Sequence, residues 1–344
     1  MSYLSRIAPT DRRRRAQVDA LLEQEGIQRD GNLDYTCGLF DEDGALLATG
    51  SCFGPTLRCL AVDHAHQGEG LLNQVLTHLT EYQAERGCFQ LFLYTKCQSA
   101  KFFGDLGFYE IARVDGKLVF MENRRDGFAR YCQKLSQHRR GDAAAIVMNA
   151  NPFTRGHLYL VEQAAKEWET VHLFVLSEDA SLVPYPVRWK LVTEGVAHLP
   201  NVVCHPSGPY IISAATFPSY FLKDADTVIL THAALDIAVF GKIAAALGIV
   251  CRYVGEEPGS HVTALYNQTM AQRLPEMGID CRIIPRLTEG DTVVSASTVR
   301  KAIHDGDLEA VRPWVPETTW RYLTSPAAAS VLQAIQRSGS VVHY

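Results

Sequence analysis

The sequence predicts an α/β protein of two domains, an α+β domain followed by a domain built on a parallel sheet. The chain has 344 residues, a length that favours two domains. A polar stretch at 133–142 separates two halves of different organisation. In the second half, wholly apolar runs alternate with helical patterns, as in sheets that are covered on both faces. We therefore expect domains at 1–135 and 143–344, joined by a linker at 136–142.

The first half is expected to open with a helix and to continue with short strands. Residues 10–26 include the basic run Arg12–Arg15 and are typical of an amphipathic helix with a solvated face, capped by Thr10 or Asp11. The remaining elements expected here are short strands within 34–54 with a hairpin turn at 42–44, a strand, a glycine-containing turn and a long helix over 56–87, a strand at 90–95, and a short helix at 99–108.

The second half is expected to form a parallel sheet with helices on both faces. Its predicted strands are 143–149, 171–177, 227–232 and 249–255, and its predicted helices are 157–168, 187–199 and 235–247. Ligands of such sheets bind beyond the carboxyl ends of the strands. The segment NPFTRGH, residues 151–157, follows the first of these strands, so its position alone predicts a binding site.

The composition excludes several classes of protein. A net charge of −5 and a pI near 6.2 argue against an indiscriminate nucleic-acid binder. The nine cysteines are scattered without a CxxC pair, a pattern typical of neither a disulfide framework nor a zinc site. The N-terminus lacks the apolar region of a signal peptide, and no apolar stretch approaches the roughly 18–20 residues that span a bilayer. We expect a cytoplasmic protein without nucleic-acid or membrane partners.

Two segments of the second half are suited to binding phosphate. Gly156 and His157 open a helix, where unpaired N–H groups and the helix dipole favour an anion. Gly156 is expected to let the ligand approach the backbone, and His157 to donate a hydrogen bond. A strand–helix turn with an incidental histidine explains this segment alone equally well. Residues 294–303, VSASTVRKAI, combine Ser295, Ser297 and Arg300 at a second helix start, which a serine-capped helix with a surface arginine explains equally well when taken alone. The two segments together are more specific than either.

These segments resemble the T/HxGH and ISSTxVR motifs of the HIGH-type nucleotidyltransferase superfamily. The resemblance implies a Rossmann-like nucleotidyltransferase domain in which a nucleophile attacks the α-phosphorus of ATP and releases pyrophosphate. It implies that Mg²⁺ accompanies the phosphates without a dedicated protein site. The acidic pair Glu256-Glu257 is better explained as a turn than as a metal site. Arg188 is predicted to be a further phosphate contact, although a solvent-facing arginine fits equally well. The implied catalytic residues are His157, Thr154 and Arg300, and the implied ATP-binding residues are Asn149, Phe153, Gly156, Arg188, Ser295 and Ser297.

The segment LAVDHAHQGEGLLNQVLTHL in the first half resembles motif A of the GCN5-related acetyltransferases. Gln67 and Gly70 match the loop that takes the pyrophosphate of acyl-CoA in that family, and these two residues are predicted to bind an acyl or prosthetic group. Leu72 stands where a small residue belongs, so we expect its side chain to crowd a pyrophosphate. His64 and Glu69 are candidate bases only because they lie near this turn. A degenerate domain that docks a partner is the alternative interpretation.

An acetyltransferase-like domain followed by a TxGH domain resembles the citrate lyase ligase family, as do HAALD at 232–236 and YVGEEP at 253–258. The resemblance implies that ATP and acetate form acetyl-AMP. It implies that the acetyl group then passes to the thiol of the phosphoribosyl-dephospho-CoA arm on the acyl carrier subunit of citrate lyase. Two other functions stay open: a nucleotidyltransferase that adenylylates a phosphorylated small molecule, and a non-catalytic docking protein.

Overall fold

The computed structural model describes residues 2–178, 180–211, 217–218, 220, 222, 224–256, 261–290 and 292–339. The chain forms two compact units, one of residues 1–130 and 218–231 and the other of residues 131–217 and 232–344. The first division lies inside helix α4 (Gly127–Ser136). The predicted linker at 136–142 stays a prediction, and the assignment of 218–231 to the first unit was not predicted.

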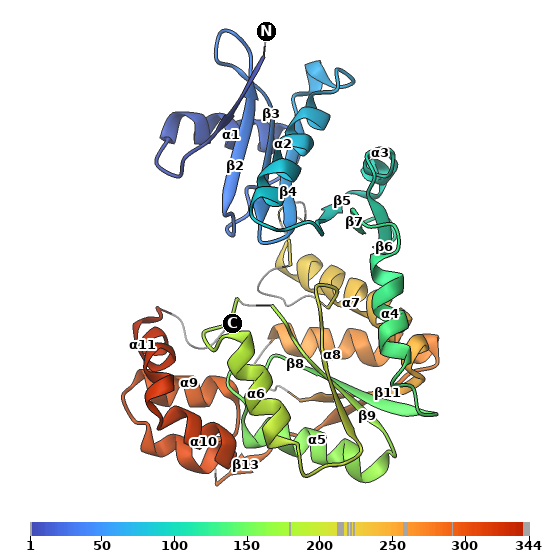
Figure 1. Ribbon diagram of the computed structural model, residues 1–344, viewed down its shortest axis with the longest axis vertical. Helices are drawn as coiled ribbons and strands as arrows, with labels where there is room; N and C mark the ends of the chain where they lie inside the picture. The colour runs from blue at the N-terminus through green and yellow to red at the C-terminus, as the bar shows by residue number, and fades with distance from the viewer. Residues whose placement is uncertain are drawn as a thin grey trace. The chain divides into compact units, whose positions relative to one another are not determined.

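The first unit is an α+β structure, as predicted, with a mixed sheet in the order β1-β2-β3-β4-β5-β7-β6 (Figure 1). Asp11 caps α1 by accepting from the N–H of Arg14 at 3.0 Å, and Gly44 lies in the β2–β3 turn with a positive φ of 80°. The strands are β1 (Tyr3–Arg6), β2 (Tyr35–Phe40), β3 (Leu46–Phe53), β4 (Thr56–Val62), β5 (Phe92–Thr95), β6 (Tyr109–Val114) and β7 (Leu118–Glu122), and the helices are α1 (Arg12–Gln24), α2 (Leu71–Glu85) and α3 (Ala100–Asp105).

The sheet of the first unit opens between β4 and β5. These neighbours run parallel but pair only at Thr56 with Phe92 and at Leu57 with Leu93. Beyond these two pairs the strands part, and α2 begins shortly after β4 ends. The gap therefore lies beside the N-terminus of α2, which Gly70 precedes in the left-handed conformation, with a φ of 73°.

The described part of the second unit contains a five-stranded parallel sheet in the order β10-β9-β8-β11-β12. The predicted strands at 143–149, 171–177 and 249–255 are confirmed, whereas β10 and β12 were not predicted. The strands are β8 (Ala143–Met148), β9 (Val171–Val175), β10 (Val202–Pro206), β11 (Ile249–Gly255) and β12 (Asp280–Ile284), and a separate small hairpin pairs β13 (Thr288–Glu289) with β14 (Thr292–Val293).

The prediction of a strand at 227–232 is wrong, because these residues belong to helix α7 (Ala225–Leu247). A short apolar run cannot be distinguished from a buried helical segment by its periodicity. By length and composition α7 could cross a membrane, contrary to the expectation that no stretch would qualify, but 61% of its most apolar window is buried inside the protein. Its Asp236 forms a buried ion pair with Arg252 of β11 at 2.8 Å, and its His232 stacks on Phe217. These contacts are those of a core helix.

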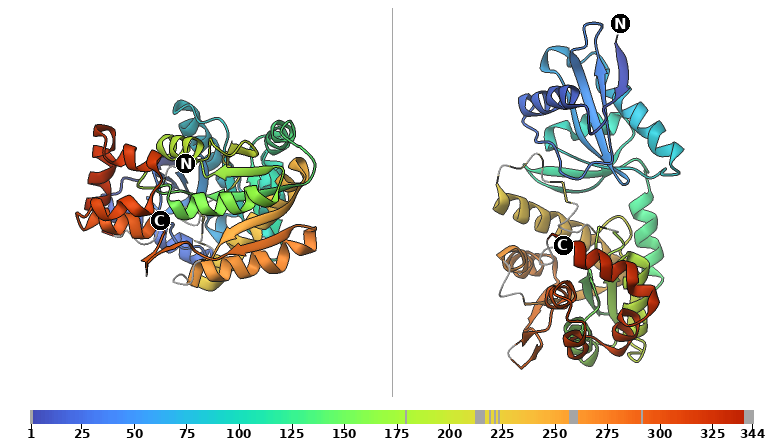
Figure 2. Two further views of the ribbon diagram at one scale, coloured as in Figure 1. Left: turned by 90° about the horizontal axis from the view of Figure 1, so that it is seen from below. Right: turned by 90° about the vertical axis from the view of Figure 1, so that its left-hand side faces the viewer.

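Helices cover both faces of the parallel sheet. Helices α5 (Arg155–Glu167) and α6 (Tyr185–Gly195) pack on the face that carries Ile146 and Leu173. On the opposite face, Phe240 of α7 lies against the guanidinium of Arg252. The helices α8 (His261–Arg273), α9 (Ala296–His304), α10 (Glu317–Leu323) and α11 (Ala329–Arg337) follow in the chain. The last three share a small apolar core and lie together in red in Figure 2.

The strand order places a crevice at the carboxyl end of β8. From β8 the chain proceeds outward through β9 and β10 and then returns to the other side of β8 as β11 and β12. The loops that leave β8 and β11 therefore diverge, and this is where ligands bind in open α/β sheets. The segment NPFTRGH begins three residues after β8 ends at Met148.

Candidate active site

The loop after β8 ends in a reciprocal cap at the start of α5. Thr154 is the N-cap, and its Oγ1 accepts a hydrogen bond from the N–H of His157 at 3.3 Å. In return, the N–H of Thr154 donates to Nδ1 of His157 at 3.1 Å. A threonine and a histidine thus satisfy donors that the first turn of a helix leaves unpaired. Thr154 is fully buried, so its hydroxyl caps the N–H of His157 away from solvent.

This cap determines how His157 presents its ring. Nδ1 must accept the hydrogen bond from Thr154, so in the neutral imidazole Nε2 carries the proton. Burial, followed by the positive charges of Arg286 and Arg300, lowers the pKa of His157 to about 3. The imidazole is therefore neutral near pH 7 and can offer Nε2–H as a donor, as the sequence analysis expected of this residue.

Gly156 brings the two predicted phosphate-binding segments together. A Cβ atom at this position would lie 2.5 Å from the carbonyl oxygen of Val294, the residue that opens the second segment. We had expected Gly156 to make room for a ligand. Its missing side chain instead makes room for the backbone of Val294, because a helix start and a neighbouring loop cross here at close range.

In the second segment, Arg300 makes the direct connection to the first. Its Nη1 donates to the carbonyl oxygen of Asn151 at 2.5 Å, and its Nη2 lies 3.4 Å from Oγ of Ser297. Ser295 is the N-cap of α9 and accepts from the N–H of Thr298 at 3.1 Å, so its hydroxyl is engaged in the cap. Ser297 remains partly exposed beside Arg300.

The placement of Arg188 does not support the predicted phosphate contact. Its side chain is fully buried, so the alternative of a solvent-facing arginine is wrong. The guanidinium donates to backbone carbonyls at the ends of β8 and β9 and in the loop before α6. These acceptors are the carbonyl oxygens of Asn149 at 2.9 Å, Leu176 at 2.7 Å, Glu178 at 2.5 Å and Val183 at 2.9 Å. Arg188 thus joins three segments that surround the candidate site.

The side chains of Phe153 and Asn149 differ in burial and in their contacts. The ring of Phe153 is fully buried in the core, against Gly195 of α6, and faces the ring of His157 with 6.0 Å between ring centres. This placement supports a packing role and not a side-chain contact with a nucleotide. Asn149 is only partly buried, and its amide exchanges hydrogen bonds with Ser181 at 2.9 and 3.3 Å.

Arg286 is a cation of this site that the sequence analysis missed. It follows β12, on the far side of β11 from β8, and its charge acts on His157. Its Nε donates to the carbonyl oxygen of Glu256, the residue after β11. The available signal was a basic residue two positions after the strand 280–284, but that strand had not been recognised. Glu257, the second half of the predicted acidic turn, lies outside the described residues.

No protein cage for a metal ion is present in the described ranges, where no group of three or more His, Cys, Asp or Glu side chains could hold one. The charged groups that act on His157 are cations, namely Arg286 and Arg300, and Ser297 lies beside Arg300. Guanidinium groups attract phosphate oxygens and do not coordinate a divalent cation.

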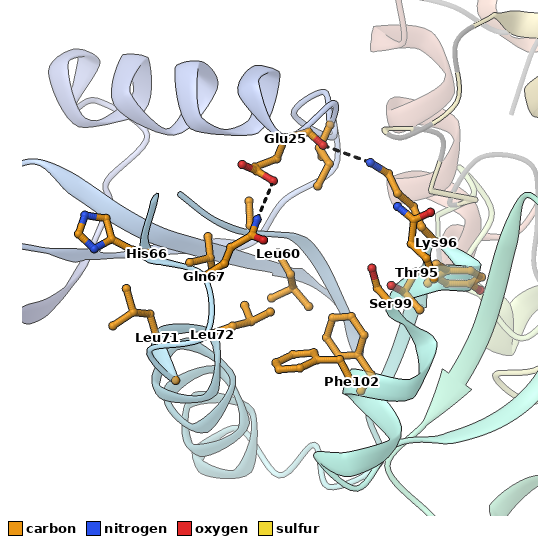
Figure 3. A pocket seen from close by; sticks show the side chains of 18 of the residues that line it. Glu25, Leu60, His66, Gln67, Leu71, Leu72, Thr95, Lys96, Ser99 and Phe102 are labelled. Atoms are coloured by element: carbon orange, nitrogen blue, oxygen red, sulfur yellow. Dashed lines mark hydrogen bonds between the residues drawn. The ribbon is translucent and has the colours of Figure 1, made fainter. Parts of the chain in front are cut away.

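The first unit holds a cavity of about 620 Å³ in the gap between β4 and β5 (Figure 3). Gln67, Gly70 and Leu72 all line it, as do residues from the later parts of both strands. The side chain of Gln67 donates to the carboxylate of Glu25 at 3.3 Å, and Lys96 donates to the carbonyl oxygen of Glu25 at 3.1 Å. Glu25 therefore connects the predicted pyrophosphate loop to the segment after β5, a contact the sequence analysis missed.

The two candidate bases near this cavity are exposed. His64 lies in a single helical turn, His64–His66, at the surface. Glu69 is also exposed, and its carboxylate lies 3.2 Å from Nδ1 of His66. Both side chains are open to water, whereas general bases usually lie in partly buried surroundings.

The fold and the geometry around His157 define a Rossmann-like domain with a capped histidine shortly after its first strand. Residues 143–323 match the family model "Citrate lyase ligase C-terminal domain". The chain is 38% identical to the citrate (pro-3S)-lyase ligase of Klebsiella pneumoniae over 320 residues, 91% of this chain and 93% of that protein. It is 36% identical to the enzyme of the same name from Escherichia coli (strain K12) over 327 residues, 93% of each. The chain belongs to the citrate lyase ligase family and is a ligase.

Among solved structures, the chain is also similar to the ribosomal-protein-S18-alanine N-acetyltransferase of Escherichia coli. The identity is 20% and the TM-score 0.28, with 36% of this chain and 92% of that protein covered.

Proposed function

We propose that the chain uses ATP and acetate to form acetyl-AMP and then acetylates a thiol on the acyl carrier subunit of citrate lyase, which activates that enzyme. The observation that supports this most directly is the contact between Gly156 and Val294, because it brings the two motif segments into one site. Family membership favours this reaction over adenylylation of a phosphorylated small molecule and over a non-catalytic docking role.

In the proposed adenylation step, an acetate oxygen attacks the α-phosphorus of ATP and the bond to the bridging oxygen of pyrophosphate breaks. Negative charge grows on the α-phosphate oxygens and on the departing pyrophosphate. His157 meets this charge with its Nε2–H, and Arg300 and Arg286 meet it with guanidinium groups. Because these donors are held before the substrate arrives, they stabilise the transition state without reorganising. Ser297 and the main-chain N–H groups at the start of α5 complete the proposed phosphate site, with Asn149 near the α-phosphate.

Mg²⁺ is proposed to enter with ATP. The residues around His157 fit that arrangement, because they leave the phosphate oxygens and water as the ligands of the ion. When bound, the ion would neutralise part of the phosphate charge. The protein would contribute the orientation of the phosphates through the groups already described.

The cavity of the first unit is proposed to hold the thiol end of the phosphoribosyl-dephospho-CoA arm of the carrier. An acyl adenylate hydrolyses unless a nucleophile is brought close, and holding the acceptor can contribute roughly 7–11 kcal/mol. A cavity of about 620 Å³ that opens at a strand gap suits a long, narrow chain. We further propose a cytoplasmic location, where the carrier's thiol is kept reduced.

The acceptor can be identified by labelling. With ATP, labelled acetate and citrate lyase whose prosthetic group is reduced, we expect label in a hydroxylamine-labile thioester on the carrier subunit. A thiol is favoured because its ordinary pKa of about 8.5, against about 10.4 for a lysine amine, leaves far more nucleophile at neutral pH. Carrier with an alkylated thiol is the control and should stay unlabelled. Label that enters mainly hydroxylamine-resistant amides would show that the acceptor is a protein amine.

Free acetyl-CoA is not expected to serve as the acetyl donor. Leu72 lines the cavity directly after the N-terminus of α2, where a pyrophosphate would need close approach. Calorimetric titration of the parent protein with acetyl-CoA should therefore show weak binding or none. Leu72→Gly should bind more tightly, while Leu72→Met, which keeps the bulk, should behave like the parent. Micromolar binding by the parent would contradict this expectation.

A further inference from the structure

The loop after β8 is held from outside at every second carbonyl group. The carbonyl oxygens of residues 149, 151 and 153 each accept a hydrogen bond from a buried side chain on a different helix, namely Arg188 of α6, Arg300 of α9 and Thr319 of α10. All three donor residues are at least 97% buried. None of these contacts was predicted from the sequence, and Thr319 was not among the candidate site residues.

Thr319 acts on the peptide group that faces His157. Its Oγ1 donates to the carbonyl oxygen of Phe153 at 2.8 Å. The N–H of the same peptide group belongs to Thr154 and donates to Nδ1 of His157 at 3.1 Å. Because a peptide group is planar, fixing the direction of its C=O fixes the direction of its N–H. The hydrogen bond from Thr319 therefore orients the N–H of Thr154 that donates to the imidazole.

We propose that Thr319 is a positioning residue for His157, which it holds in the tautomer that carries its proton on Nε2. The proposal rests on the role proposed for His157 in the adenylation step. The effect passes through the Phe153–Thr154 peptide group alone, and Thr319 itself touches no substrate.

Two physical effects support this role. A buried hydrogen bond to the C=O polarises the peptide group and strengthens the N–H as a donor, since linked hydrogen bonds reinforce one another. A firm N–H donor at Nδ1 favours the tautomer protonated on Nε2. In the other tautomer Nδ1–H would face that N–H, and its remaining acceptor would be the hydroxyl of Thr154, 2.9 Å from Nδ1. Histidines that ligate metals are oriented in the same way by a partner on their second nitrogen, and loss of that partner typically costs about 10–100-fold in activity or affinity.

The chain offers a closely matched control in the preceding residue. Thr318 lies on the same helix, and its buried hydroxyl has no hydrogen-bond partner among the residues that the structure describes. Thr318→Val thus makes the same chemical change as Thr319→Val without breaking a contact. Thr319→Ser keeps the hydroxyl and serves as the rescue variant.

The test combines turnover with a direct reading of the tautomer. In acetate-dependent ATP–pyrophosphate exchange, Thr319→Val should lose about 10–100-fold in kcat, with a much smaller change in KM for ATP. Thr319→Ser and Thr318→Val should stay within a fewfold of the parent. In ¹⁵N-histidine NMR, with the His157 signals assigned from His157→Gln, the parent should show an unprotonated Nδ1. Thr319→Val should shift His157 toward the other tautomer.

A merely structural role would lower stability without moving the ¹⁵N signature. A Thr319→Val protein whose His157 tautomer is unchanged would therefore overturn the proposal, whatever its activity. If Thr319→Val does not fold, Thr319→Cys replaces it, and its weak S–H donor should give an intermediate shift; an unchanged signature there overturns the proposal equally. If the parent shows no exchange but Thr319→Val still changes the tautomer, the proposed function fails while this inference stands.

Discussion

His157→Ala is expected to lower acetate-dependent ATP–pyrophosphate exchange by at least about 100-fold, since removing one preorganised donor to a developing anion costs about 10²–10³ in kcat. The Nε2–H of His157 is such a donor, because the cap with Thr154 fixes the neutral tautomer before ATP arrives. The lost donor serves the transition state, so the fall should lie mainly in kcat. Exchange is the measurement of choice because it needs no carrier protein.

His157→Gln is the matched partner of this variant. Its amide N–H can reach toward the position of Nε2, so exchange should be intermediate between that of the parent and that of His157→Ala. Both variants should stay folded, because the hydroxyl of Thr154 still caps the N–H of residue 157. A folded His157→Ala protein that exchanges at the parent rate would show that the adenylation site lies elsewhere.

The position of the candidate site could be inferred from the sequence because short-range rules determine the loop that carries it. A strand that ends at Met148, followed by a proline and a helix start at Arg155, specifies a loop beyond the carboxyl end of a strand. The serine before the second helix start likewise indicated its N-cap, and Ser295 is that N-cap. Both features depend on residues fewer than ten positions apart.

The interactions between the segments could not be predicted in this way. Nothing near Gly156 in the sequence indicates that its neighbour in space is Val294. Arg286 was missed because β12, the strand before it, has exposed residues that weaken the apolar signal. Helix α7 was divided wrongly because its first apolar residues fit a strand as well as a helix. In each case the deciding contact is distant along the chain.

The role predicted for Arg188 from the sequence and its placement in the structure imply opposite effects of its loss. As a phosphate contact, it would matter for ATP binding and little for stability. As the structure has it, the guanidinium is fully buried and donates to four backbone carbonyl groups from three segments. A buried acceptor left unpaired costs about 1–3 kcal/mol, so several such losses add to a large fraction of the stability of a domain.

Arg188→Met is therefore expected to destabilise the second unit by about 4 kcal/mol or more, because methionine fills much of the space but donates nothing. At roughly 2–4 °C per kcal/mol for a unit of this size, its thermal transition should fall by about 10 °C. Lys190→Met, on the same helix, is the control. The side chain of Lys190 is 70% exposed, and its ion pair with Glu194 is long at 3.9 Å. Its replacement should therefore change the free energy of unfolding by no more than about 0.5 kcal/mol. Calorimetry of both variants, alongside the KM for ATP in the exchange assay, separates the two roles. An Arg188→Met protein with the parent's melting temperature and a raised KM would restore the phosphate contact predicted from the sequence.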